Sequence, residues 1–172
     1  MRITDALLGE HGLLYVLFDQ ITEAMANESK DLPALTRVLA GLLGSHAKLE
    51  EDHLFPALQP HIGDMGPLAV MQMEHRQIDE LLESMASTTD PEQLKQQTQA
   101  LLDVTLNHFS KEEGILFHLA ERFLDDATLH QLGDTWSQTR GVNLSAAGCA
   151  AAPRRTCASC PAAQGPCSPR AR

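Results

Sequence analysis

The sequence predicts an all-α protein: an antiparallel up-down-up-down four-helix bundle, followed by a short fifth helix and an irregular C-terminal tail. Hydrophobic residues make up 43% of the 172 residues but aromatic residues only 4%, whereas sheets depend on aromatic and β-branched side chains. Four long segments carry apolar residues at intervals of three and four, which is the helical period. The connections between these segments are short, so neighbouring helices are expected to be antiparallel.

The helices can be delimited by their end signals and their apolar stripes. They are expected at about residues 5–27, 31–60, 67–86, 91–123 and 126–138. Thr4 or Asp5 can cap the first helix. Prolines occupy the first turns of the second, third and fourth helices, where the missing N–H has no intrahelical partner to lose. The short fifth helix carries the only tryptophan, Trp136.

The helical pattern stops after residue 140, so we expect a bundle domain at residues 1–140 and a tail at residues 141–172. The tail is rich in Ala, Pro and Arg and is expected to be disordered. It also contains all the cysteines of the chain, namely Cys149, Cys157, Cys160 and Cys167. Two of them have the C-x2-C spacing of redox and zinc sites, without a second such pair. Reduced cysteines in a disordered tail, metal binding and thiol redox chemistry all remain open.

Charge and hydropathy restrict the partners and the location of the protein. The first 140 residues hold 9 basic and all 23 acidic residues, a net charge of −14. Such an acidic body repels nucleic acid and anionic membrane surfaces, so neither is expected as a partner. No stretch is long and apolar enough for a membrane span, and the N-terminus lacks a signal-peptide pattern. A cytoplasmic location is therefore expected.

Histidines interrupt the apolar stripe of each of the four long helices, and on two helices a glutamate follows four residues later. These residues are His11, His46, Glu50, His75, His108 and Glu112. One histidine on an apolar face is usually a core residue, but burying all six groups without partners would be costly. Imidazoles and carboxylates without thiolates suit iron or manganese. Two glutamates reaching in from opposite helices can each bridge two ions, which favours a dinuclear centre.

The order H…H-x3-E…H…H-x3-E, with the same Glu-Glu-x2-Leu-Phe continuation at residues 50–55 and 112–117, resembles the hemerythrin-like family of HHE cation-binding domains. The resemblance covers roughly residues 5–124. It implies a four-helix bundle around two iron ions with an oxo or hydroxo bridge, in which the six residues are ligands and the glutamates bridge. It also implies small molecules such as O2, NO or H2O2 as partners.

This chain departs from the oxygen-carrying hemerythrins on its third helix and at its last ligand pair. Those proteins have two histidines four residues apart on the third helix, whereas here His75 is flanked at that distance by Met71 and Asp79. They also end with H-x4-D rather than H-x3-E. One imidazole is therefore missing, and Asp79 or His53 is left as a candidate extra ligand. Tyr15, one turn after His11, is either a half-buried core residue or a hydrogen-bonding group beside the site.

The missing imidazole moves the expected function away from simple oxygen carriage. We expect a non-haem di-iron protein that binds O2, NO or peroxide for sensing or detoxification. Whether such a protein turns over as an enzyme stays open. The alternative is an iron sensor or iron-storage protein without turnover, whose fold depends on its metal.

Overall fold

The computed structural model describes residues 1–143 of the chain, and this part contains helices and no strands. In order, the elements are α1 (Ile3–Ala26), α2 (Leu32–Leu49), the π-helical segment η1 (Glu50–Leu54), α3 (Phe55–Ile62), α4 (Pro67–Ser87), α5 (Pro91–Lys111), the π-helical segment η2 (Glu112–Leu116), α6 (Phe117–Phe123) and α7 (Asp126–Arg140). The first π-helical segment joins α2 to α3, and the second joins α5 to α6, so the described residues form four long helical segments and a fifth helix. The predicted all-α bundle is confirmed.

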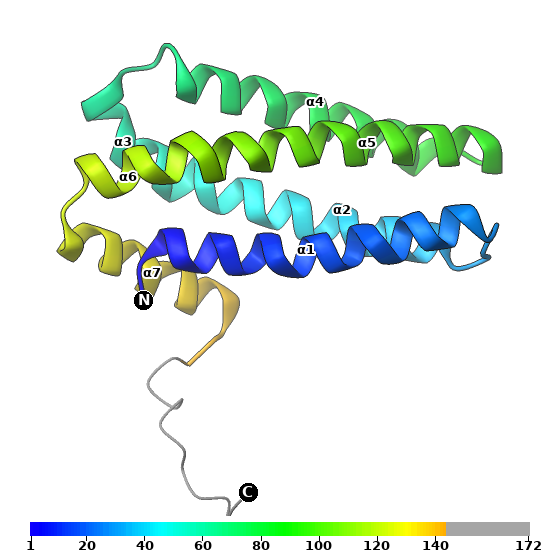
Figure 1. The fold of residues 1–172 in the computed structure, drawn as a ribbon, viewed down its shortest axis with the longest axis horizontal. Coiled ribbons are helices and arrows are strands. Elements are labelled where there is room, and N and C mark those ends of the chain that lie inside the picture. The colour runs from blue at the N-terminus through cyan, green and yellow to red at the C-terminus, as the bar shows by residue number, and fades with distance from the viewer. Residues whose placement is uncertain (144–172) are drawn as a thin grey trace, which may run out of the picture. The chain divides into compact units, whose positions relative to one another are not determined.

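The four long segments lie lengthwise beside one another (Figure 1). Helix α1 packs against α2, α4 packs against α5, and further contacts join α2 to α4 and α3 to α6. Helix α7 packs against α1 near the N-terminus and also contacts α6. None of the helices in the described part of the chain has the length and hydropathy required to cross a bilayer.

The ends of the helices follow the predicted signals with three differences. The second long segment runs to Ile62, the end of α3, rather than to about residue 60. Helix α1 begins at Ile3 rather than near Asp5, because the Asp5 carboxylate accepts a hydrogen bond from the backbone N–H of Arg2 at 3.2 Å. Helix α7 runs two residues further than predicted, to Arg140, and is capped by Gly141, whose positive φ of 65° is the left-handed conformation that favours glycine. Asp90 caps α5, since its side chain accepts from the N–H of Glu92 at 3.0 Å.

The sequence pattern predicts uninterrupted α-helices for the second and fourth long segments, and this prediction is wrong. Each contains one π-helical turn, closed by a hydrogen bond from the N–H of Phe55 to the carbonyl of Glu50 and from that of Phe117 to that of Glu112. A π turn holds one residue more than an α turn, so it resets the inward face of the helix. Such turns are rare and are frequently found at functional sites.

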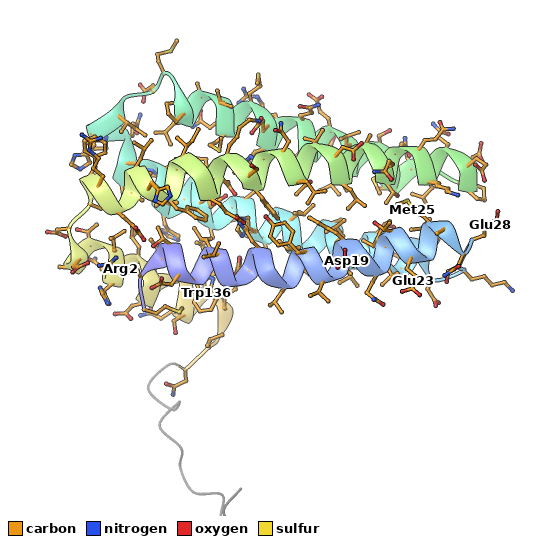
Figure 2. The ribbon with its side chains drawn as sticks, in the orientation of Figure 1. Arg2, Asp19, Glu23, Met25, Glu28 and Trp136 are labelled. Atoms are coloured by element: carbon orange, nitrogen blue, oxygen red, sulfur yellow. The ribbon has the colours of Figure 1, made fainter. Side chains whose placement is uncertain are left out.

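The apolar core consists of two clusters. One gathers Phe18, Leu39 and Leu101, and the other gathers Leu7, Leu58 and Leu116. Both contain fully or nearly fully buried leucines and phenylalanines contributed by all of the long segments. Figure 2 shows side chains in the space between the helices. The polar side chains that are also buried in the bundle are mostly histidine, glutamate and threonine.

Gly133 of α7 lies where the chain start crosses the helix, and this contact predicts a strong substitution effect. A Cβ at this position would lie 2.1 Å from the carbonyl oxygen of Met1, closer than atoms approach in proteins. Gly133→Ala is therefore expected to lower the free energy of unfolding by about 1–3 kcal/mol, as overpacking does, measured by urea denaturation. Gly44→Ala is the matched control, because a Cβ there meets nothing within 4 Å and alanine is the better helix former. Equal gains in both variants would show that the close approach at Gly133 does not exist.

Candidate metal centre

The structure brings the six predicted residues together in one buried cluster. His11 lies on α1, His46 on α2, His75 on α4 and His108 on α5, while Glu50 and Glu112 are the first residues of the two π-helical segments. All six are exposed by 2% or less. Every long segment of the bundle therefore contributes to the same point in its interior.

The four imidazoles form two pairs that face each other through the same ring atom. The Nε2 atoms of His11 and His46 are 3.2 Å apart, and those of His75 and His108 are 3.0 Å apart. We call the first pair, on α1 and α2, subsite A and the second pair, on α4 and α5, subsite B. When neither Nε2 atom carries a proton, two nitrogen atoms at such a distance direct two lone pairs at one point, which is an arrangement that a shared cation would occupy.

The two buried glutamates lie between the subsites. Glu112 reaches both, with one oxygen 3.1 Å from Nε2 of His11 and the other 2.9 Å from Nε2 of His108. One oxygen of Glu50 lies 3.4 Å from Nε2 of His75 and 3.6 Å from Nε2 of His46. Despite these distances, all four carboxylate oxygens lack a hydrogen bond of acceptable geometry. Buried polar atoms without partners call for an explanation, and an ion is one of the few.

The donor set fits a pair of cations. Among the described residues, two groups have ligand atoms within 4.8 Å of one another: Glu50, His75, His108 and Glu112, and separately His11, His46 and Glu112. Glu112 belongs to both groups, as a bridging carboxylate would. The nitrogen and oxygen donors, without sulfur, match the preference of iron or manganese rather than that of a structural zinc site.

The electrostatics of the metal-free cluster show how strongly its groups interact. Burial and the charge of Glu112 raise the pKa of Glu50. Burial also opposes ionisation of Glu112, but the surrounding imidazoles outweigh it and hold the pKa of Glu112 well below its usual range. The pKa values of His46 and His75 would be lowered by burial, yet the nearby carboxylates raise both to about 10. Protons therefore balance the buried carboxylates where a metal cation would otherwise do so.

A second layer of carboxylates surrounds the histidines, and sequence reasoning missed it. The Nδ1–H of each histidine donates to a glutamate on a neighbouring segment, at 2.8–3.1 Å. The pairs are His11 with Glu113, His46 with Glu10, His75 with Glu51, and His108 with Glu74. Each of these bonds fixes the proton on Nδ1 and leaves the lone pair of Nε2 pointing to the centre, as in metal sites of known type.

The four outer glutamates connect the bundle into a closed ring. Glu10 of α1 orients His46 of α2; Glu51 of η1 orients the histidine of α4. Glu74 of α4 orients His108 of α5, and Glu113 of η2 returns to the histidine of α1. The available signal in the sequence was adjacency, because every outer glutamate directly precedes or follows one of the six cluster residues.

Aromatic side chains hold two of the imidazole planes. Phe109 stacks on His11 with ring centroids 3.8 Å apart, and Phe55 stacks on His75 at 5.5 Å. Tyr15 is half-buried in the apolar core, and its hydroxyl donates to Glu113 at 2.7 Å. Both interpretations of Tyr15 from the sequence thus describe part of its role.

The two candidates for an extra ligand lie outside the cluster. Asp79 is exposed and His53 is half-buried, and neither belongs to the two groups of ligand atoms found among residues 1–143. The coordination position left by the missing imidazole is therefore not filled by either of them. Cys149, Cys157, Cys160 and Cys167, with nearly all of the predicted tail, lie outside the described residues.

Comparisons with known proteins found a matching family, curated relatives and a solved structure. The hemerythrin HHE cation-binding domain family matches residues 2–120. The iron-sulfur cluster repair protein YtfE of Escherichia coli K12 and that of Shigella boydii are both 35% identical to the chain, over 48% of it. The chain spans less than half of these relatives, 45% of their length. The crystal structure of a hemerythrin HHE cation-binding domain-containing protein from Mycobacterium kansasii matches with a TM-score of 0.67 and 25% identity, over 82% of this chain and 88% of that one.

Proposed function

The chain belongs to the hemerythrin family of HHE cation-binding domains, and from this premise we propose that it is a non-haem di-iron protein. In this proposal subsite A and subsite B each hold one iron ion, and Glu50 and Glu112 lie between the two ions. With iron held by these residues, the protein would bind O2, NO or peroxide, for sensing or for detoxification. When bound, iron supplies redox chemistry and an open coordination position for such a small molecule.

One observation carries the proposal. The Nε2 atoms of four histidines and four carboxylate oxygens without hydrogen-bond partners meet at one place that is shielded from solvent. Leaving two buried carboxylates in this state would cost the protein about 1–3 kcal/mol for each unpartnered group. A binding role explains why such an arrangement is present in the middle of an apolar bundle.

The residues of the chain have definite tasks in this proposal. The outer glutamates hold a proton on Nδ1 of each histidine, so that Nε2 stays unprotonated toward the ion. Phe109 and Phe55 cover imidazole faces and exclude water from the centre. With Asp79 and His53 outside the cluster, one position remains for an exogenous ligand. This is why small-molecule binding with reactivity is favoured over simple carriage.

A second candidate function is iron supply, and one feature of subsite B favours it. The side chain of Glu51, which orients His75, is 48% exposed. It lines a surface hollow of about 290 Å³ together with Phe55 and Asp64. Subsite B therefore has a solvent-facing carboxylate next to its histidine, as a route for iron release requires. The relatives are named for iron-sulfur cluster repair, which is consistent with this alternative. In such a process the chain would act as an iron donor.

The two candidates can be separated with iron-loaded full-length protein. Under the first, anaerobic addition of NO or H2O2 changes the optical spectrum in proportion to the iron pair, and the iron stays bound. Under the second, incubation with a metal-free iron-sulfur protein, sulfide and a thiol transfers iron, and the chain ends with less iron than it began with. An iron-loaded protein whose optical spectrum does not change on addition of O2, NO or H2O2 would contradict the first function.

Single histidine substitutions test the ligand assignment. His108→Ala is expected to lower the iron content, because it removes one of the two imidazoles of subsite B, the one that Glu74 orients. His130→Ala is the control, since this histidine is exposed on α7 and its Nδ1–H donates to the carbonyl of Asp126, away from the six cluster residues. Iron per chain is measured by metal analysis after identical loading. Equal iron content in both variants would remove His108 from the ligand set.

A further inference from the structure

Helix α7 reaches the candidate metal centre through one of the outer glutamates. The match to the family ends at residue 120, whereas α7 spans Asp126–Arg140. Trp136 of α7 lies next to α1 (Figure 2), and its indole N–H donates to Oε1 of Glu10 at 2.6 Å. The guanidinium of Arg140 donates to the same oxygen at 2.6 Å and to Oε2 at 3.1 Å. The Oε2 atom also accepts from Nδ1 of His46 at 2.8 Å.

Arg140 also contacts α2, at the residue next to His46. Its guanidinium donates to the backbone carbonyl of Ser45 at 3.1 Å and also to the Ser45 hydroxyl. Ser45 directly precedes His46 on α2. The arginine therefore joins α7 to the carboxylate of α1 and to the backbone that carries the imidazole. A planar, bidentate guanidinium is well suited to such a contact, because it defines the orientation of the carboxylate.

The other three outer glutamates are held differently. Glu74 pairs with Lys111, and Glu113 accepts from Tyr15. Glu51 is the most exposed of the four, with 48% of its side chain accessible, against 15% for Glu10. Glu10 is the one that receives donors from a helix outside the four-segment bundle. Burial works against ionisation of Glu10, but the hydrogen bonds from His46, Arg140 and Trp136 prevail and lower its pKa to about 2.

The contacts of Trp136 and Arg140 with Glu10 have two opposite effects on His46. The positive charge of Arg140 draws electron density from Glu10 and weakens its bond to the imidazole. The same contacts keep Oε2 aimed at Nδ1, whereas a free glutamate side chain would lose that orientation to solvent. The Arg140–Glu10 pair is partly buried, with 19% and 15% of the two side chains exposed, so both side chains are held in place. Removing a partner that orients a ligand histidine typically costs 10–100-fold in metal affinity. The orienting effect is therefore the larger one.

We propose that α7 is a positioning element of subsite A: Trp136 and Arg140 fix Glu10, and Glu10 fixes the imidazole of His46. Subsite A then binds its ion more tightly than it would without α7, and the cations that position the outer glutamates differ between the two subsites. Subsite B has its own positioning cation, Lys111, which acts through Glu74 on His108. This inference rests on the proposed function, because it requires two metal ions.

The test measures two dissociation constants for ferrous iron in the full chain, under anaerobic conditions with a competing chelator. Arg140→Met and Trp136→Phe are each expected to raise the dissociation constant of one of the two ions by about 10-fold and to leave that of the other ion unchanged. Lys111→Met is expected to weaken the other ion by a similar factor. In the double variant Arg140→Met with Lys111→Met, each of the two dissociation constants is then expected to rise about 10-fold. A rise of about 100-fold in one of them is not expected.

Matched variants separate positioning from a loss of fold. Trp136→Phe keeps an aromatic ring and removes the N–H donor, and Arg140→Lys keeps the charge and is expected to recover part of the lost affinity. Gln138→Ala, at an exposed position of α7, is expected to change neither constant. Circular dichroism of the metal-free variants checks that the helices are intact.

Failure of the positioning role of α7 and failure of the proposed function give different results. Unchanged constants in both Arg140→Met and Trp136→Phe, or an equal weakening of both ions, would overturn the positioning role of α7 while the di-iron function stands. Tighter binding in Arg140→Met would also overturn it, because it would show that the charge effect prevails. A wild-type chain that takes up no ferrous iron would overturn the proposed function, and the inference with it.

Discussion

Glu112→Gln is expected to abolish the binding of both iron ions, with affinity losses of more than about 100-fold, the upper end for residues that only orient a ligand. The reason is its position. The carboxylate oxygens of Glu112 lie 2.9–3.9 Å from the Nε2 atoms of all four histidines, so this residue belongs to both subsites. Glutamine keeps the shape but loses the negative charge and one acceptor. Iron content after loading, measured by metal analysis, is the readout.

Asp79→Asn is the matched control for this substitution. It also replaces a carboxylate by an amide on a helix that carries one of the four histidines, but at an exposed position outside both groups of ligand atoms. It is expected to retain the iron content of the wild type. Retention of two ions by Glu112→Gln would show that the bridging position assigned to this glutamate is wrong. Loss of iron in Asp79→Asn would restore Asp79 as a ligand.

Glu50→Leu is expected to stabilise the metal-free protein while it destroys the metal site. Glu50 is fully buried, its two oxygens have no hydrogen-bond partner, and burial together with Glu112 raises its pKa. A buried polar group without a hydrogen-bond partner costs about 1–3 kcal/mol, and a leucine side chain carries no such cost. The free energy of unfolding of both metal-free proteins, from urea denaturation, should therefore be higher for Glu50→Leu.

The same pair of proteins shows the opposite order in the presence of iron. A ligand present at 1,000 times its dissociation constant stabilises the folded state by about 4 kcal/mol, and only the wild type is expected to gain this. Glu80→Leu, an exposed glutamate of α4, serves as the control and should show no gain in the metal-free state. A destabilised metal-free Glu50→Leu would mean that Glu50 has a structural role apart from metal.

The sequence predicts the centre of this site well, because helical geometry is regular. A spacing of four residues places His46 and Glu50, and likewise His108 and Glu112, on one face of a helix. An apolar stripe then tells which face is buried, and short loops bring the buried faces together. These local rules were sufficient to predict the bundle and the convergence of all six residues on one buried point.

The surroundings of the centre depend on register between helices, which periodicity does not contain. Glu10 could be recognised as a neighbour of His11, yet its partner is His46 on another helix, 36 positions away. The π-helical turns at Glu50 and Glu112 have no period of their own in the sequence, although the repeated Glu-Glu-x2-Leu-Phe marks both. The role of α7 was hidden for the same reason, since its contact to Glu10 joins residues more than 120 positions apart.

The central claim is that the buried histidines and glutamates hold two iron ions, and metal analysis combined with an optical spectrum of the aerobically purified full-length protein tests it most directly. The account predicts two irons per chain and near-ultraviolet absorption of a bridged iron pair. Both should disappear on chelation and return when ferrous iron and air are supplied. A metal-free protein that stays folded and takes up no ferrous iron would contradict it.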